Sequence, residues 1–246
     1  MQRKRKLATS ILGTALMLVV ASATAYAAED GHGGTKTVME LFEATGAVGY
    51  MMVAVSVMGT ALCIQYGVQL TRDKLAPPSL SDELEGLMEA GDYDEAIEVC
   101  DANGGYLATI MGDALRLRHA GYDYMIGALE QVAAEETFKV NARISYLSLL
   151  GNVAPLLGLL GTVTGMISSF QVIETLKAPT PGDLAKGVYE SLVNTTMGLF
   201  IAIVFLVAFF VFKNKVTKMT LSINLQGVDM LKHLAPVGGG EGKKGH

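Results

Sequence analysis

Four long stretches of this 246-residue chain carry no charged side chain. They lie between Lys6 and Glu29, between Glu43 and Arg72, between Arg143 and Glu174, and between Glu190 and Lys213. Each stretch is long enough to cross a hydrocarbon core, which takes about 20 helical residues. Half of all residues are hydrophobic and only 17% are charged, which fits neither an ordinary soluble domain nor a disordered chain. We therefore expect an all-α, polytopic membrane protein.

The first stretch has the features of a signal peptide. Four basic residues at positions 3–6 precede an apolar core, and small residues follow it up to Ala25-Tyr26-Ala27. This order predicts a signal peptide over residues 1–27 and a periplasmic segment over residues 28–45. The same run is long enough to span as an uncleaved anchor, so that alternative stays open.

The other three stretches predict three transmembrane helices, at residues 46–70, 144–173 and 187–212. Basic residues mark the cytoplasmic end of each one: they are Arg72 and Lys74, then Lys139 and Arg143, then Lys213, Lys215 and Lys218. The first of these helices would then cross the membrane from outside to inside, the second from inside to outside, and the third from outside to inside. Residues 174–186 would form a periplasmic loop, and residues 213–246 a cytoplasmic tail with a disordered, Gly-rich end.

Residues 71–143 read as a helical cytoplasmic domain. Turn signals at Pro77-Pro78, Gly91-Asp92 and Asn103-Gly104-Gly105 separate segments of helical periodicity, and the last segment runs into the next span without a visible break. Residues 72–143 hold 15 Asp and Glu against 6 Lys and Arg. That acidic balance argues against a nucleic-acid partner. The two cysteines have no metal-ligand spacing around them, so neither a metal site nor a disulfide framework is predicted.

Small residues recur at helical spacing in the second and third mature spans. Gly158, Gly161 and Gly165 fall on one helix face, and Gly187 and Gly198 mark a similar face of the next helix. Such ridges let two helix backbones approach closely, so helix packing is the preferred interpretation. Pro155 is expected to bend the second span.

Polar side chains within the same spans are the candidate functional residues. Glu190 lies about one turn into the third span, where a carboxylate is a functional hypothesis by default. The alternative places it at headgroup depth, paired with Lys186 four residues earlier. The other candidates carry hydroxyl or amide groups that could line a wet path or simply bond their own backbone: they are Thr162, Thr164, Asn194, Thr195 and Thr196.

At these residues the sequence resembles the proton-channel family of ExbB, TolQ and MotA, the energising subunits of bacterial inner-membrane motors. The segment 154–166, which reads APLLGLLGTVTGM, is similar to the family's second-helix signature. Residues 187–199 resemble its third helix, and residues 87–100 resemble its cytoplasmic domain. Three spans and a modest cytoplasmic domain favour the ExbB and TolQ branch.

The resemblance implies a homopentamer whose central pore holds a single-span subunit of the ExbD or TolR type. That partner would carry the proton-binding Asp, and a TonB-like or other periplasmic effector is a further implied partner. By position, Thr162 and Thr195 match the family's pore-lining threonines, and Glu190 matches the glutamate near them. Thr164, Asn194 and Thr196 remain candidate pore-lining residues. The transported ion would be the proton, with no cofactor.

Two other classes stay open. A membrane scaffold would cluster partners through its small-residue ridges and conduct nothing, and a MotA-like motility stator would need a different partner. An enzyme has little support, because the four histidines lie outside the spans and no nucleophile, metal or phosphate-loop pattern appears.

Overall fold

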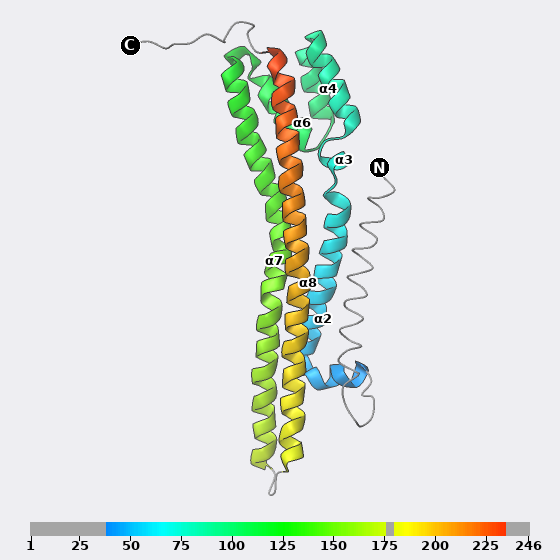
Figure 1. Cartoon of the computed structure of the whole chain (residues 1–246), viewed down its shortest axis with the longest axis vertical. Helices are drawn as coiled ribbons and strands as arrows, with labels where there is room; N and C mark the ends of the chain where they lie inside the picture. Colours follow the sequence, from blue (N-terminus) through cyan, green and yellow to red (C-terminus); the bar gives the residue numbers. More distant parts are fainter. Residues whose placement is uncertain (1–37, 176–179, 235–246) are drawn as a thin grey trace, which may run out of the picture. The chain divides into compact units, whose positions relative to one another are not determined.

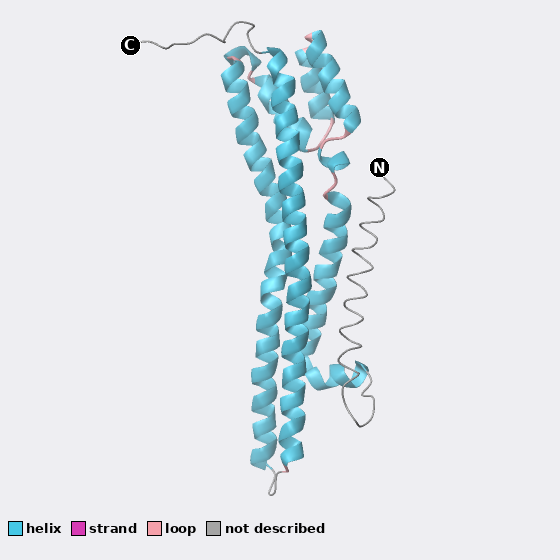
Figure 2. Ribbon diagram, in the orientation of Figure 1, coloured by secondary structure: helices cyan, strands magenta, loops and turns pink. Residues whose placement is uncertain are grey.

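The computed structural model describes residues 38–175 and 180–234, and this part of the chain contains helices and no strand (Figure 2). The predicted signal peptide at 1–27 lies outside the described residues, as do residues 28–37 and the end of the predicted tail. Three long helices are apolar enough to cross a membrane, over Ala47–Gln69 and within Tyr122–Thr175 and Gly187–Leu231. The expected all-α fold with three candidate spans is therefore confirmed.

Three long helices and several short ones make up the described chain (Figure 1). The long ones are α2 (Val38–Gln69), α7 (Tyr122–Thr175) and α8 (Pro181–Leu231). Between α2 and α7 lie α3 (Arg72–Leu75), α4 (Pro78–Ala90), α5 (Tyr93–Ala102), α6 (Tyr106–Arg116) and the 3₁₀ turn η1 (Arg118–Ala120); η2 (Lys232–Leu234) follows α8.

The two longest helices extend well beyond the predicted spans. Helix α7 continues from Tyr122 through Pro155 to Thr175, which confirms the expected unbroken helix into the second mature span. Helix α8 likewise continues past the predicted end of the span at Phe212, so that residues 213–231, which the sequence assigns to the cytoplasmic tail, are helical. The signal was present in the sequence: Val216, Thr220 and Ile223 recur at helical spacing, and all three are buried.

The described residues divide into two compact units. The first, here called the span unit, comprises residues 38–67, 144–175 and 180–211. The second, here called the core unit, comprises residues 68–143 and 212–234. Helices α2, α7 and α8 supply the span unit, and the short helices with the remaining turns of α7 and α8 build the core unit.

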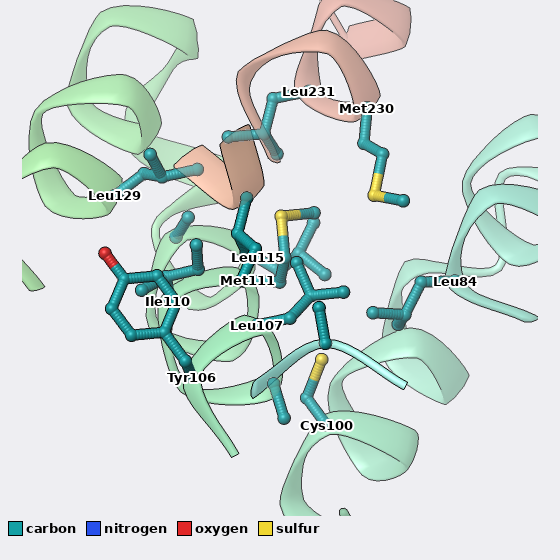
Figure 3. Packing of buried hydrophobic residues seen from close by; sticks show 14 of the residues in the cluster. Leu84, Cys100, Tyr106, Leu107, Ile110, Met111, Leu115, Leu129, Met230 and Leu231 are labelled. Atoms are coloured by element: carbon teal, nitrogen blue, oxygen red, sulfur yellow. The ribbon is translucent and has the colours of Figure 1, made fainter. Parts of the chain in front are cut away.

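The core unit is organised around α6. Leu107, Ile110, Met111 and Leu115 are completely buried on this helix. Figure 3 shows them facing side chains of α4, α7 and α8, among them Leu84, Leu129 and Leu231. Helix α6 is buried on most of its faces, and its buried positions are apolar or small apart from Tyr106. The acidic residues of α4 and α5 stay exposed.

The turns of the core unit are the ones that the sequence predicts. Gly91 ends α4 with φ 82°, and Gly105 precedes α6 with φ 138°. Both angles lie in the region that favours glycine, which is why glycine stands at these two ends. The predicted turns at Gly91-Asp92 and Asn103-Gly104-Gly105 are confirmed.

A buried tyrosine links three helices of the core unit. The Tyr106 hydroxyl lies 2.7 Å from Asn224 Oδ1, 2.9 Å from Thr137 Oγ1 and 3.1 Å from the carbonyl oxygen of Ala133. Burial raises the pKa of this hydroxyl. Since these partners lie on α7 and α8, the contact holds α6 against both helices and gives the buried Tyr106 hydroxyl its hydrogen-bond partners.

Candidate functional site

The predicted small residues of α7 and α8 meet face to face in the span unit. Gly158 lies against the backbone of Thr195 and Gly198, and Gly198 in turn lies against the carbonyl oxygen of Ala154. A Cβ added at Gly198 would stand only 2.6 Å from that oxygen. Because backbone cannot move aside as a flexible side chain can, this part of the contact requires glycine on both helices.

Further along the same contact, each glycine accommodates a polar side chain of the opposite helix. A Cβ at Gly161 would lie 2.7 Å from Cβ of Asn194. Gly165 receives the side chain of Ser191, and Gly187 receives that of Ser169. We call this contact the stripe. In it, glycines of each helix face side chains or backbone of the other helix: they are Gly158, Gly161 and Gly165 of α7 and Gly187 and Gly198 of α8. Its buried polar members are Ser169, Ser191 and Asn194.

One hydrogen bond crosses between the two helices at this stripe. The Thr195 hydroxyl donates to the carbonyl oxygen of Gly158 at 3.2 Å. That carbonyl is within reach because Gly158 has no side chain and the helices are closely packed. A hydroxyl that bonds a neighbouring helix is also a group that water can compete for when the helices separate.

The other predicted threonines bond their own helices. Thr162 donates to the carbonyl oxygen of Leu159 at 2.6 Å, and Thr164 to that of Leu160 at 2.9 Å. Thr196 donates to the carbonyl oxygen of Leu192 at 3.0 Å. Thr164 and Thr196 are exposed and Thr162 is half-buried. The structure thus brings Thr195 and Asn194 into the contact between α7 and α8. Thr162, Thr164 and Thr196 instead bond carbonyl oxygens of their own helices.

Glu190 lies on α8 one turn before Asn194, and its side chain is half-buried. Whether it pairs with Lys186 is not decided, because the side chain of Lys186 is outside the described part. Pro155 lies within α7 and is half-buried. The roles predicted for Glu190 and Pro155 therefore stay predictions.

The sequence left two features of this site open. Helical spacing places both Ser168 and Ser169 near the face of Gly158, Gly161 and Gly165, and the structure buries Ser169 and exposes Ser168. Nothing in the sequence indicated that α2 joins the pair, yet Gly59 lies directly against the ring of Phe205 on α8. Periodicity identifies a face of one helix but not the helix that covers it, so only the fold could reveal this contact.

Residues 105–224 match the MotA/TolQ/ExbB proton channel family. The match includes α6, all of α7 and nearly the whole of α8, so it contains the entire stripe described above. Over this segment the chain is similar to that family. The predicted family resemblance is thereby confirmed.

Three relatives support the ExbB and TolQ branch. A putative biopolymer transport protein ExbB homolog of Methanothermobacter thermautotrophicus is 29% identical over 171 residues, 68% of this chain and 60% of the relative. The Tol-Pal system protein TolQ of Pseudomonas aeruginosa is 34% identical over 82 residues, 33% and 36% of the two chains. The biopolymer transport protein ExbB of Pseudomonas putida is 28% identical over 146 residues, 56% and 44%. The chain thus spans less than two thirds of each relative.

Proposed function

We propose that this chain is a ring-forming subunit of a proton-motive-force-driven motor in the bacterial inner membrane. It would conduct protons together with a single-span subunit of the ExbD or TolR type and so energise transport or envelope processes. The observation that carries the proposal is the inter-helix bond from Thr195 to Gly158 within family-matched apolar helices. Hydroxyl groups can both donate and accept hydrogen bonds, as a proton path requires.

The proposed cycle uses a carboxylate of the partner. No Asp lies within residues 46–70, 144–173 or 187–212, so this chain offers a path but no aspartate to bind the proton midway. Protons would enter from the periplasmic side along Thr195 and Thr162, neutralise the partner's Asp and leave to the cytoplasm. One charge crossing about 100 mV provides roughly 2.3 kcal/mol, so a few protons suffice for a conformational or rotary step. Glu190 would balance charge or gate hydration.

A homopentamer would surround the partner, with the N-terminus of the mature chain in the periplasm and the C-terminus in the cytoplasm. A TonB-like or other periplasmic effector would receive the work. The cycle as proposed needs no cofactor, because the proton itself is the transported species.

Ion flux into liposomes tests this proposal. The chain is co-expressed with its partner subunit, and proton uptake is compared for wild type, Thr195→Ala and a variant of the partner's membrane Asp. We expect both variants to assemble and to lose flux. Thr60→Ala is the matched control, because the Thr60 hydroxyl lies on α2 and bonds the carbonyl oxygen of Ser56 within its own helix.

The glycine and serine stripe is also what a non-conducting scaffold would use to pack its helices. Assembled complexes of normal stoichiometry that carry neither protons nor sodium ions, with or without an energised membrane, would favour the scaffold over the channel.

A further inference from the structure

Asn194 is the least satisfied polar side chain of the helix contact. It is only 4% exposed, and its side-chain oxygen Oδ1 accepts no hydrogen bond from the described residues. It packs on Gly161 of α7, where a Cβ would lie 2.9 Å from both Cγ and Nδ2 of the asparagine. Buried side-chain oxygens without a donor are rare in folded proteins and call for a specific reason.

The neighbouring polar groups are satisfied by the helices themselves. The Ser191 hydroxyl donates to the carbonyl oxygen of Gly187 at 2.7 Å, and the Ser169 hydroxyl to that of Gly165 at 2.8 Å. An amide oxygen cannot do the same, because it only accepts hydrogen bonds and the backbone N–H groups of a helix interior are already used. Oδ1 of Asn194 therefore needs a donor from outside its own helix.

No nearby side chain of the pair has a proton to spare for it. Gly161 offers none, and the single hydroxyl protons of Thr195 and Thr162 are directed to the carbonyl oxygens of Gly158 and Leu159. Water is the remaining donor. The amide group of Asn194 packs on Gly161 through Cγ and Nδ2, and its Oδ1 is buried, so water does not reach this oxygen while the helices are packed.

We propose that Asn194 is a hydration point of the ion pathway, exposed when α7 and α8 separate beside Gly161. Water then enters and donates to Oδ1. The same widening breaks the bond from Thr195 to Gly158 and frees a hydroxyl and a carbonyl oxygen for water. This inference rests on the proposed function, and it identifies the contact between Asn194 and Gly161 as the place where α7 and α8 separate.

The packing explains why asparagine suits such a contact. An unpaired amide oxygen raises the free energy of the closed pair relative to the hydrated one. Because the opposite residue is glycine, no side chain has to leave its place for the pair to open. A leucine at position 194 keeps the branching of asparagine at Cγ but has methyl groups in place of Oδ1 and Nδ2. Leucine therefore lacks the unpaired oxygen that favours opening of the helix pair, but its side chain has nearly the same shape as that of asparagine.

The experiment compares wild type, Asn194→Leu and Asn194→Ala in the assembled complex with the partner subunit. Thermal stability in detergent and proton flux into liposomes are both measured. We expect both variants to keep or raise the Tm and to conduct about tenfold less, since a closed state freed of its unpaired oxygen is more populated. Thr60→Ala is the control, because it removes a hydroxyl of another span that is paired within its own helix, and its flux should stay within about twofold of wild type.

A fall in the Tm of both Asn194 variants would overturn the inference, since it would mean that the asparagine stabilises the closed contact. Unchanged flux at an unchanged or higher Tm would overturn it as well. These outcomes are separable from failure of the proposed function. Loss of flux in Thr195→Ala with normal flux in Asn194→Leu contradicts only the inference, whereas a wild-type complex that conducts nothing contradicts the function and the inference together.

Discussion

The glycines of α7 and α8 differ in whether an added side chain would find room. Gly158, Gly161 and Gly198 have backbone or short side chains within van der Waals range of any added Cβ. Gly127 also lies within α7, but a Cβ there would meet nothing within 4 Å. The same residue type thus has a packing role at some positions of one helix and none at another.

Alanine substitutions should separate these two kinds of glycine. Gly161→Ala is expected to lower the thermal stability of the detergent-solubilised protein, because the new methyl group would collide with Asn194. Gly127→Ala should instead stabilise by about 0.5–1 kcal/mol, since it lowers the entropy of the unfolded chain without a clash. Equal losses at both positions would contradict the assignment of the contact.

Tyr106→Phe should cost the core unit about 0.5–1.5 kcal/mol, because the half-buried Asn224 would lose a hydrogen-bond donor. Chemical denaturation followed by circular dichroism measures this effect. Tyr124→Phe is the matched control, since the Tyr124 side chain is exposed and its change should be near zero.

Cys100 gives the core unit an alkaline pH dependence. Burial raises the pKa of its thiol from 9.0 to about 11. The folded state therefore holds a proton that the unfolded state releases first, so stability should fall as pH rises from about 9 to about 11. The slope from this group is at most about 1.4 kcal/mol per pH unit. Cys100→Ala, which cannot ionise, should be measurably less sensitive in denaturant titrations at pH 8, 9.5 and 11.

At the scale of elements, residues 213–231 of α8 contribute a packed helix face to the core unit. Residues 213–231 place Val216 and Ile223 in fully buried positions, and Ile223 belongs to the hydrophobic cluster around α6. The segment belongs to the core as much as α4 or α6 does, although its many polar residues resemble those of a tail. Its stability comes from packing of one face rather than from overall hydrophobicity.

Ile223→Ala is therefore expected to destabilise the core unit by about 2–4 kcal/mol, the usual range for a large buried aliphatic side chain. Limited proteolysis of the core unit, together with denaturant titration, would report the change. Thr217→Ala in the same helix alters an exposed side chain and should shift stability by less than about 0.5 kcal/mol. A small effect at position 223 would show that 213–231 is only a peripheral extension.

At the scale of the whole molecule, the charge pattern predicts a topology that labelling can test. In a Cys63→Ala/Cys100→Ala background, Ala178→Cys should react with a membrane-impermeant thiol reagent added from the periplasmic side. Ala102→Cys, which lies on the exposed surface of the core unit, should react only after the inner membrane is permeabilised. The reverse pattern would contradict the basic-residue rule for this chain.

The sequence by itself determined the elements that follow from local chemistry. Uncharged stretches long enough to span, glycines at turns such as Gly91 and Gly105, and the glycine face of α7 can all be read along the chain, because each depends on residues within a few turns. Hydroxyl and amide groups in a span were recognisable for the same reason. The family resemblance at 154–166 had the same local origin.

Only the tertiary structure decided which helices meet and what each polar group faces. It paired Asn194 with Gly161, directed Thr195 to the carbonyl oxygen of Gly158, and packed Ile223 into the core around α6. Thr195 and Thr196 are adjacent and chemically identical, yet one bonds a neighbouring helix and the other its own. Such differences depend on the rotation and separation of packed helices, which arise from contacts between residues distant in sequence and leave no local pattern.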